Sequence, residues 1–350
     1  MAGVHLLGVA STSQSRRSRG PAVLAREAVG LALADAGVTA AEVDGVAIAA
    51  GDDFAASAEA ALGGMERDFQ CRCGLGTVAL DSAWKAVSAG AGEVVVCVGF
   101  DGARSPVGVD GDWLEAQAAA AREYLQHSGA TERHLARVAA KNRRHGAANP
   151  NALLSAEVGV EEVLESEMLL WPLRRLMVAA PARDTAAAVV LGSPRRGRRR
   201  GAKVPQVRAS VMLDGGSAGG AETSRAARLA YLSAELGPED VDLAEIEDPT
   251  PVEEIAAYEA LEFAPEGNGP ELVESGFTAL GGVLPVNPSG GALSQGASRG
   301  AGGIRQLVEL SLQLRDRAER RQVPGARVGL ALCGGPTSPA GPTALTILTA

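Results

Sequence analysis

The feature that most constrains this chain is a cysteine placed directly before a segment with helical periodicity. Cys73 is followed by Gly-Leu-Gly-Thr-Val-Ala-Leu80, and Trp84 and Val87 then continue the apolar spacing of i, i+4 and i+7 from Leu80. This spacing predicts a helix with one buried stripe. Gly90 is well placed to end that helix, and the valine-rich run after it predicts a buried strand.

The order loop, cysteine, helix, strand places Cys73 at or just before a helix N-terminus. Free backbone N–H groups and the positive end of the helix dipole favour a thiolate at such a position. The segment therefore predicts that Cys73 is a nucleophile.

Charge and cysteine content exclude several classes of protein. The 33 Lys and Arg residues against 42 Asp and Glu residues give a net charge of −9, which argues against a general nucleic-acid binder. No apolar run is long enough for a membrane span, and residues 1–11 lack the pattern of a signal peptide. Four cysteines in 350 residues make no disulfide framework, and Cys71 and Cys73 have no second ligand pair at zinc spacing. We therefore expect a soluble cytoplasmic protein with no metal.

Strands alternate with helices along the first part of the chain, which predicts a largely parallel α/β sheet. Residues 104–183 break this alternation with two polar helices, about 113–127 and 132–146. We expect this segment to form a lobe that covers one end of the sheet. Its histidines His134 and His145 are expected at the surface.

The second half of the chain repeats the order of elements of the first. Val241-Asp242 follows a helix and an acidic turn and precedes a strand, as Val43-Asp44 does. This similarity predicts a duplicated α/β half. The predicted halves are residues 1–194 and 205–350, joined by the basic segment 195–204. In an acidic protein such a segment is more often a solvated linker than a phosphate site.

Three glycine-rich segments are candidates to meet at one site: 71–76, 287–296 and 333–335. Glycine lets the backbone approach a ligand and point N–H groups at an oxyanion. Cys333 would then act as acid or base beside a nucleophile, although it and Cys97 also fit small buried hydrophobes. For Cys97, flanked by valines, we favour burial. The G-x-G-x-x-A pattern at residues 74–79 is discounted as a dinucleotide site, because no apolar strand is expected directly before it.

The segment that begins at Cys73 resembles the Cys-x-x-Gly-x-x-Ala-Leu nucleophile segment of thiolases, especially the sterol-carrier-protein-x, lipid-transfer-protein-like type. Four other segments resemble that family in order and spacing, namely 142–150, 184–191, 272–276 and 285–293. The resemblance implies a duplicated thiolase fold, in which two similar α/β halves form a five-layered αβαβα core. It also implies a dimer.

The resemblance also assigns site residues. Cys73 matches the position of the family's acylated nucleophile, and Cys333-Gly334-Gly335 matches the loop that carries its acid/base cysteine. The family's Gly-His-Pro motif is Gly-Ala297-Ser298 here, and its His-Asp-x-Phe motif begins at Glu247. Both histidines that activate the nucleophile and hold the thioester oxygen are therefore absent. The oxyanion and substrate loops are expected to contain Gly334, Gly335, Asn287, Gly290, Gly291, Ala297 and Ser298.

Three functions remain open. The first is a divergent thiolase-like acyltransferase, or an enzyme that forms or cleaves C–C bonds, acting on an acyl-CoA or acyl-carrier thioester through Cys73. Backbone N–H groups near Cys73 and Gly334 would hold the oxyanion, and Cys333 or Glu247 would move protons. The second is a catalytically impaired subunit that binds acyl-CoA or a partner protein. The third is a retro-aldolase of the same superfamily, ranked last because such relatives tend to lose the cysteine that this chain keeps.

The resemblance implies a coenzyme A thioester as substrate and no permanently bound cofactor. The partners it suggests are a second copy of the chain and a small acyl-CoA-binding zinc-ribbon/OB-fold protein.

Overall fold

The computed structural model of this protein describes residues 3–14, 19–50, 69–102, 111–200, 203–214, 220–337 and 341–350. Within these residues one long mixed sheet has the strand order β3-β2-β4-β7-β1-β8-β11-β10-β9. Its strands are β1 (Val4–Ser11), β2 (Gly45–Ala49), β3 (Phe69–Cys73), β4 (Val94–Asp101), β7 (Thr185–Gly192), β8 (Gln206–Leu213), β9 (Leu243–Ile246), β10 (Val328–Cys333) and β11 (Thr343–Thr349). A small separate hairpin pairs β5 (Met168–Leu170) with β6 (Leu173–Arg174).

The sheet consists of two halves with the same strand order and directions. In the N-terminal half β2 pairs parallel with β4, and β4, β7 and β1 then pair antiparallel. In the C-terminal half β9, β10, β11 and β8 repeat this pattern, whereas β3 extends the N-terminal half at its edge. The halves join at a short antiparallel contact in which Val4 faces Val207 and His5 faces Gln206. The structure therefore has the two similar α/β halves that the sequence predicts.

The described part of the segment between the halves contains a short helix. β7 ends at Gly192, and α7 (Pro194–Arg200) follows before β8 begins at Gln206. Within α7, Arg196 pairs with Glu42 at 2.9 Å and with Glu93 at 3.4 Å. Part of the predicted linker is therefore helical, and its Arg196 contacts carboxylates of the N-terminal half.

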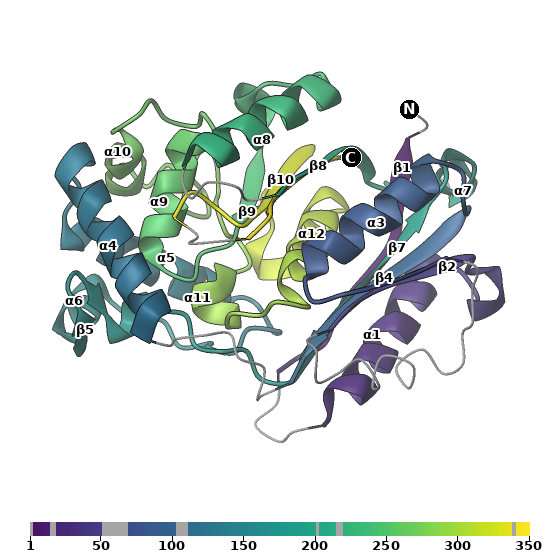
Figure 1. The fold of residues 1–350 in the computed structure, drawn as a ribbon, viewed down its shortest axis with the longest axis horizontal. Helices are drawn as coiled ribbons and strands as arrows, with labels where there is room; N and C mark the ends of the chain where they lie inside the picture. The colour runs from purple at the N-terminus through teal and green to yellow at the C-terminus, as the bar shows by residue number, and fades with distance from the viewer. Residues whose placement is uncertain are drawn as a thin grey trace.

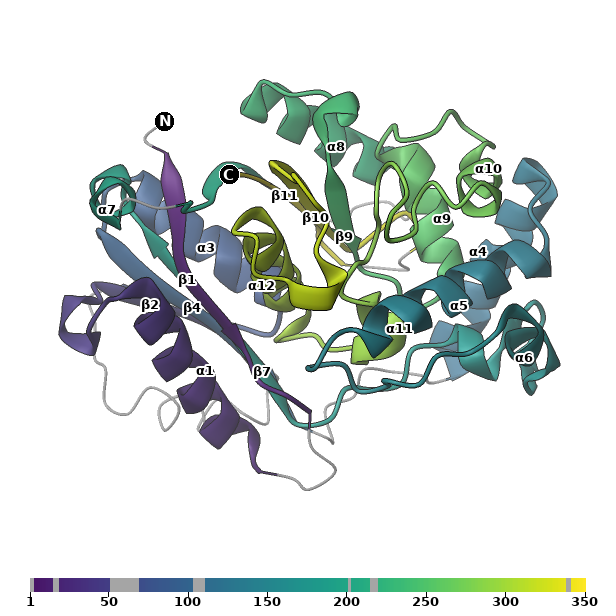
Figure 2. The same ribbon diagram turned by 180° about the vertical axis from the view of Figure 1, so that it is seen from behind.

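Helices pack on both sides of each half-sheet and produce five layers (Figure 1). α1 (Pro21–Ala36) covers the outer face of the N-terminal half, and α8 (Gly220–Ala234) covers the outer face of the C-terminal half. α3 (Gly76–Ser88) and α12 (Gly302–Leu314) lie between the two halves, in one apolar cluster with side chains of both. Seen from behind, β1 crosses the molecule between α1 and α12 (Figure 2).

The small side chains of the chain explain how these layers pack. β4 and β7 are buried along their whole length, as expected for strands covered on both faces. The face that α1 turns to them is made of alanine, valine and leucine, namely Leu24, Ala25, Ala28, Val29, Ala32, Leu33 and Ala36. Alanine-rich faces let a helix approach a sheet closely, so the core needs few aromatic residues.

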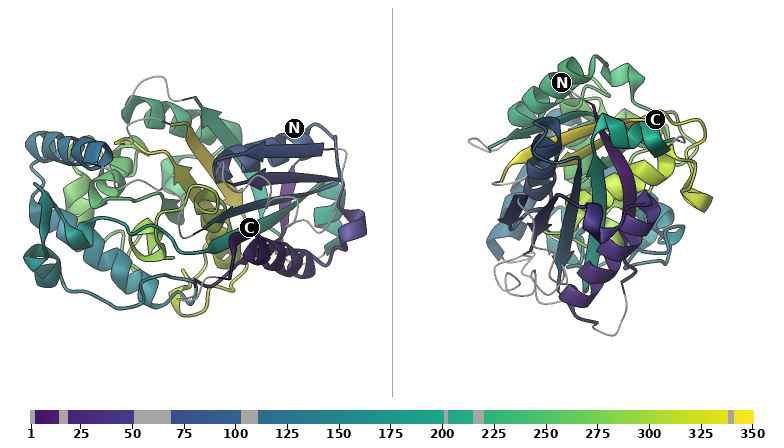
Figure 3. Two further views of the ribbon diagram at one scale, coloured as in Figure 1. Left: turned by 60° about the horizontal axis from the view of Figure 1, so that its bottom comes forward. Right: turned by 90° about the vertical axis from the view of Figure 1, so that its right-hand side faces the viewer.

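A lobe of helices lies at the end of the molecule away from the N-terminal half-sheet (Figures 1 and 3). It contains α4 (Gly111–Ser128), α5 (Glu132–Ala147) and α6 (Val160–Glu165), and α5 contacts α9 (Pro251–Ala260) and α11 (Gly291–Gln295). A further short helix, α10 (Gly269–Glu274), packs against α5 and α9. In the part of the chain that the structure describes, no helix is both long and apolar enough to cross a membrane.

The repeated Val-Asp motif has the same structural task in both halves. The Oδ2 atom of Asp44 accepts the N–H groups of residues 93–94, at 2.8 and 2.9 Å, where β4 begins. The Oδ2 atom of Asp242 accepts those of residues 327–328, at 2.7 and 2.8 Å, where β10 begins. Each aspartate thus fixes the start of the neighbouring parallel strand.

We predict that Asp44→Ala and Asp242→Ala each lower the free energy of unfolding by about 2 kcal/mol, because each removes hydrogen bonds to a charged acceptor. Urea denaturation followed by circular dichroism measures the loss. Glu239→Ala, at an exposed acidic position close to Asp242, is the control and should change stability by less than about 0.5 kcal/mol. Equal stability of all three variants would contradict the assigned role.

Candidate active site

Cys73 lies at the carboxyl end of β3, not within a helix. It is paired with Ala49 of β2, and α3 begins three residues later at Gly76. The half-buried thiol donates to the carbonyl oxygens of Leu75 at 3.2 Å and Ile48 at 3.6 Å. Both acceptors are carbonyls, so the thiol is a hydrogen donor in this arrangement. The loop expected before Cys73 is strand β3, which pairs in parallel with β2.

A loop of the C-terminal half lies directly against the Cys73 segment. The N–H of Gly76 donates to the carbonyl oxygen of Arg299 at 3.0 Å. The next carbonyl, that of Gly300, is so close that a Cβ on Gly76 would lie 2.4 Å from it and a Cβ on Gly99 only 1.9 Å. The loop before α12 therefore sits on the end of β4 and on the first turn of α3.

Asp101, at the end of β4, holds this loop in place. Its carboxylate accepts the hydroxyl of Ser298 at 2.5 Å and the N–H of Ala301 at 2.9 Å. It also accepts the N–H of Gly300 at 3.1 Å from each oxygen. The predicted substrate-loop residue Ser298 is thus bound to another part of the protein, and sequence reasoning missed Asp101 as its partner.

Ala297, the other predicted residue of this motif, is held through its backbone. Its N–H donates to Ala180 and its carbonyl accepts from Ala182, both at 2.8 Å. The side chain is half-buried. A methyl group offers no hydrogen-bond donor here, in place of the imidazole that the family motif carries.

We predict that Gly99→Ala destabilises the protein by roughly 3 kcal/mol, because the new methyl group would collide with the backbone carbonyl of Gly300. Gly74→Ala is the matched control, since a Cβ at Gly74 meets nothing within 4 Å. It should stay within about 0.5 kcal/mol of wild type. Thermal unfolding of both variants tests this, and a stable Gly99→Ala protein would contradict the close contact.

The C-terminal half contributes Glu247 and Cys333 from neighbouring strand ends. Glu247 follows β9, Cys333 ends β10, and the N–H of Glu247 donates to the carbonyl of Leu332 at 2.9 Å. The N–H of Gly334 donates to Oε2 of Glu247 at 3.0 Å. The N–H expected to hold a thioester oxyanion is therefore occupied by a carboxyl group, and that part of the sequence-based hypothesis does not fit this arrangement.

Burial controls the charge of both groups. It raises the pKa of Glu247 above the ordinary value, although the Gly334 N–H and the positive charges of Arg299 and Arg305 oppose the shift. Burial also raises the pKa of the Cys333 thiol, and the negative charge of Glu247 adds to that effect. A thiol with a raised pKa stays protonated near neutrality, so Cys333 is a weak nucleophile.

Gln306 of α12 fixes the position of the Cys333 thiol. The sulfur donates to Oε1 of Gln306 at 2.9 Å, and Nε2 of Gln306 donates to the carbonyl of Leu332 at 3.0 Å. A Cβ on Gly303 would lie 3.1 Å from the sulfur and 2.6 Å from the methyl carbon of Thr77, in the first turn of α3. Cys333 therefore lies close to the helix that follows Cys73, although the two come from different halves.

Glu253 is a second buried carboxyl group, which the sequence analysis missed. It lies in the first turn of α9 and is fully buried, and it accepts the N–H of Thr337 at 3.3 Å. Burial and the charge of Glu247 raise the pKa of Glu253 to about 8, against the opposing effect of Thr337. A carboxyl with a pKa near neutrality is suited to proton transfer.

Three predicted substrate-loop residues make close packing or hydrogen-bond contacts within the protein. The side chain of Asn287 donates to Glu254 and accepts from the N–H of Ile246, both at 2.7 Å. A Cβ on Gly290 would lie 2.6 Å from the backbone of Gly146. A Cβ on Gly291 would lie 2.2 Å from the carboxylate of Asp248. These contacts bind the loop to the lobe and to β9, and leave the polar atoms of Asn287 engaged.

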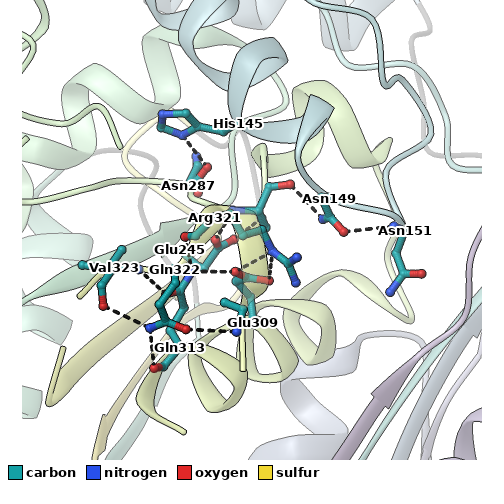
Figure 4. Close-up of polar contacts among 12 residues, drawn as sticks. His145, Asn149, Asn151, Glu245, Asn287, Glu309, Gln313, Arg321, Gln322 and Val323 are labelled. Carbon is teal, nitrogen blue, oxygen red and sulfur yellow. Dashed lines mark hydrogen bonds and ion pairs between the residues drawn. The ribbon is translucent and has the colours of Figure 1, made fainter. Parts of the chain in front are cut away.

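A further buried polar cluster lies behind this loop (Figure 4). Nε of Arg321 donates to both carboxylate oxygens of Glu309 at 2.9 Å. Glu245 of β9 accepts the N–H and the hydroxyl of Ser289 at 2.9 and 2.6 Å. Burial and the charge of Glu309 raise the pKa of Glu245 to about 8. This cluster packs α12 against β9.

Cys97 is buried in β4, as the sequence predicts.

His145 is buried, contrary to the expectation that it lies at the surface. Its Nδ1–H donates to the carbonyl of Asn287 at 2.9 Å (Figure 4). Its Nε2 accepts the N–H of Leu280 at 3.0 Å. Burial, together with the charge of Lys141, lowers the pKa of His145 to about 3. The ring therefore stays neutral and serves as a structural cross-link.

We predict that His145 makes stability depend on pH between about 3 and 6.5. In that window the unfolded chain binds a proton at this residue and the folded chain does not, so the free energy of unfolding rises with pH. The difference in stability between wild type and His145→Gln should therefore shrink as the pH falls from 7 to 4.5. Urea denaturation at both pH values measures it, and a constant difference would contradict the prediction.

The described residues contain no group of three or more His, Cys, Asp or Glu side chains arranged to hold a metal ion. The candidate site consists of Cys73 at the carboxyl end of β3, Glu247 and the turn after Cys333 at the carboxyl ends of β9 and β10, and Glu253 in the first turn of α9. In α/β proteins this edge of the sheet is where ligands bind.

Comparison with known proteins identifies the family to which this chain belongs. Residues 215–347 match the family model described as "Thiolase C-terminal domain-like". The chain is 34% identical over 285 residues to an acetyl-CoA acetyltransferase of Methanothermobacter thermautotrophicus, and the alignment covers 75% of this chain and 74% of that protein. The chain belongs to the thiolase family. This confirms the resemblance and the duplicated thiolase fold.

Two other similarities bear on the type of thiolase. The chain is 35% identical over 224 residues to sterol carrier protein 2 of Bos taurus, covering 60% of this chain but only 41% of that longer protein. A solved structure described as "Ltp2-ChsH2(DUF35) aldolase" matches with a TM-score of 0.88 and 26% identity, over 100% of this chain and 98% of the other. Solved thiolase structures match in fold at TM-scores of 0.72 and 0.77.

Proposed function

We propose that this chain catalyses retro-aldol cleavage of a 3-hydroxyacyl-CoA thioester, with Glu247 as the group that accepts the hydroxyl proton. The observation that carries the proposal is the partly buried carboxyl of Glu247, which accepts the Gly334 N–H where an acyl-transfer enzyme needs an oxyanion donor. Burial raises its pKa and makes it a stronger base than an exposed glutamate. The structural similarity to an aldolase supports the same chemistry.

The reaction requires only the removal of one proton from the 3-hydroxyl group and the return of one proton to C2. The Glu247 carboxylate takes the proton of the 3-hydroxyl group, and the electrons of that O–H bond form a carbonyl at C3. The C2–C3 bond breaks, and its electron pair is held at C2 as the enolate of the thioester. A proton returned to C2 yields a shortened acyl-CoA and releases a ketone or aldehyde. No covalent enzyme intermediate and no oxidant are required.

The arrangement of the histidines also favours this chemistry over acyl transfer. The chain has four histidines. His5 lies at the opposite end of the N-terminal sheet from Cys73, since it pairs with Gly192 while Ala49 pairs with Cys73. His145 is held neutral by its two bonds, and the other two, His127 and His134, belong to the lobe. None is positioned as the base that a thiolase nucleophile requires.

We further infer that the chain works with a second protein, as the aldolase neighbour is described as a complex with a DUF35 protein. A small acyl-CoA-binding partner agrees with the expectation drawn from the sequence. The same proposal includes association of two copies, a cytoplasmic location and coenzyme A as part of the substrate, because the chain belongs to the thiolase family.

A second candidate is acyl transfer through Cys73. It is favoured by the similarity to an acetyl-CoA acetyltransferase and by the position of the half-buried thiol next to the N-terminus of α3. Under this alternative, the Gly334 N–H must exchange Glu247 for the thioester oxygen when substrate binds. Covalent acylation of Cys73 distinguishes it from the first proposal.

We predict that Glu247→Gln lowers kcat/KM for cleavage of 3-hydroxyacyl-CoA thioesters by about 10²–10⁴, the range of general acid–base catalysis. Cys73→Ala should retain activity within about fivefold, because the proposed reaction forms no bond to sulfur. The assay quantifies the released carbonyl compound and the shortened acyl-CoA by mass spectrometry, with a DUF35-type partner present and absent. Glu239→Gln, an exposed carboxyl that precedes β9 whereas Glu247 follows that strand, is the control.

Intact-protein mass spectrometry after incubation with acyl-CoAs decides between the two candidates. An acyl adduct that disappears in Cys73→Ala, together with an inactive Cys73→Ala enzyme, would replace the retro-aldol proposal with acyl transfer. Absence of any adduct, with cleavage that depends on Glu247, would support the retro-aldolase.

A further inference from the structure

The side-chain amide of Gln306 binds two different groups at the end of β10. Its Nε2 donates to the carbonyl of Leu332 at 3.0 Å, and its Oε1 accepts the thiol of Cys333 at 2.9 Å. Gln306 and Cys333 are both buried. One side chain of α12 therefore holds a backbone carbonyl and the sulfur beside it at this strand end.

The carbonyl of Leu332 determines the orientation of the amide. A carbonyl oxygen can only accept a hydrogen bond, so the NH₂ group of Gln306 faces it and the amide oxygen faces the sulfur. Because the amide oxygen carries no hydrogen, the sulfur of Cys333 is the donor in this contact. A thiolate at the same position would face the negative end of the amide dipole, so the contact favours the protonated thiol.

Gly303, one turn before Gln306 on the same face of α12, makes room for this contact. A Cβ on Gly303 would lie 3.1 Å from the sulfur of Cys333 and 2.6 Å from the methyl carbon of Thr77 in α3. A side chain at this position would push α12 away from the sulfur. The glycine therefore lets the helix lie close enough for the amide of Gln306 to reach the thiol.

The same carbonyl also connects Gln306 to Glu247. The oxygen of Leu332 accepts the N–H of Glu247 at 2.9 Å in addition to the amide of Gln306, and its two lone pairs allow both bonds. Glu247 follows directly after Ile246, which is paired with Leu332 in the parallel contact of β9 with β10. The amide of Gln306 therefore fixes the carbonyl that binds the backbone of Glu247.

The charged groups around Cys333 also favour a neutral thiol. Burial raises the pKa of Cys333, and the negative charges of Glu247 and Glu245 add to this shift. The hydrogen bond to Gln306 acts in the same direction, because it too stabilises the form that keeps its proton.

We propose that Gln306 is a positioning residue of the candidate site: its amide keeps Cys333 as a thiol whose proton points at Oε1, and it fixes the Leu332 carbonyl that binds the backbone of Glu247. The proton of Cys333 is then directed at α12. A thiol held in this way keeps its proton, which leaves the carboxyl of Glu247 as the proton acceptor at these strand ends. The inference rests on the proposed function for that role of Glu247, but not for the contact with the thiol.

The S–H stretching band of Cys333 in the Raman spectrum tests the contact without any activity assay. The band is isolated as the difference between the full chain and its Cys333→Ala variant at neutral pH. A hydrogen bond weakens the S–H bond, so the wild-type band should lie at lower frequency than that of a thiol without an acceptor. Gln306→Met has a similar length but only a weak acceptor, and it should move the band to higher frequency.

Gln313→Met is the matched control. Gln313 is buried in the same helix, two turns further on, and its Nε2 donates to Glu309 and to the carbonyl of Arg321. Its replacement should leave the band where it is in the wild type. A wild-type band at the frequency of a free thiol, or no S–H band at neutral pH, would overturn the proposal even if Gln306→Met failed to fold. A band that does not move in a folded Gln306→Met protein would overturn it as well.

Kinetics test the connection to Glu247. If cleavage of 3-hydroxyacyl-CoA is observed, Gln306→Met should lower kcat about 10-fold and leave KM within about threefold, since it disturbs the base and not the contacts with substrate. A wild-type kcat in this variant would overturn the part of the proposal that concerns Glu247. A protein with the expected S–H bands but without cleavage activity would keep the role of Gln306 at the thiol and remove only the proposed reaction.

Discussion

The contact of one backbone carbonyl with two glycines holds the two halves of this protein together at the candidate site. The carbonyl of Gly300 lies where side chains on Gly76 or Gly99 would otherwise be, and Asp101 binds the N–H groups around it. Protein interiors are close-packed, so such a contact cannot be loosened by a methyl group without moving a helix or a strand.

Within that arrangement, replacement of a histidine by Glu247 changes what the site can do. An imidazole can donate a hydrogen bond to a thioester oxygen, whereas an ionised carboxylate can only accept one. The structure is consistent with this difference, because the carboxyl takes up the Gly334 N–H itself. The family fold is retained, but the Gly334 N–H contacts a carboxyl group at the place where the family resemblance implies a thioester oxygen. Fold membership therefore does not determine which reaction is catalysed.

Local patterns in the sequence were sufficient for many of the elements and for the duplication, although they missed β3 and α7. The apolar spacing around Trp84 predicted α3, and the repeated Val-Asp motif predicted equivalent strands, since both signals lie within a few residues. The site partners were not predictable in this way. Asp101 and Ser298 are 197 residues apart, and Glu253 resembles an ordinary exposed acid in the first turn of a helix. Only long-range packing buries it, as it buries His145 in a helix with a polar sequence.

The duplication also explains why only one of the two equivalent pairs of strand ends carries candidate reactive groups. Ala49 follows Asp44 by the same number of residues as Glu247 follows Asp242, and Gly99 stands in β4 where Cys333 stands in β10. In the N-terminal half this pair of strand ends is filled by the backbone of Gly300, which lies against the carbonyls of Ala49 and Phe100. The two halves thus have the same strand arrangement but differ at the carboxyl ends of these strands. The C-terminal half thus supplies both the backbone that fills the strand ends of the N-terminal half and, at its own equivalent strand ends, Glu247 and Cys333.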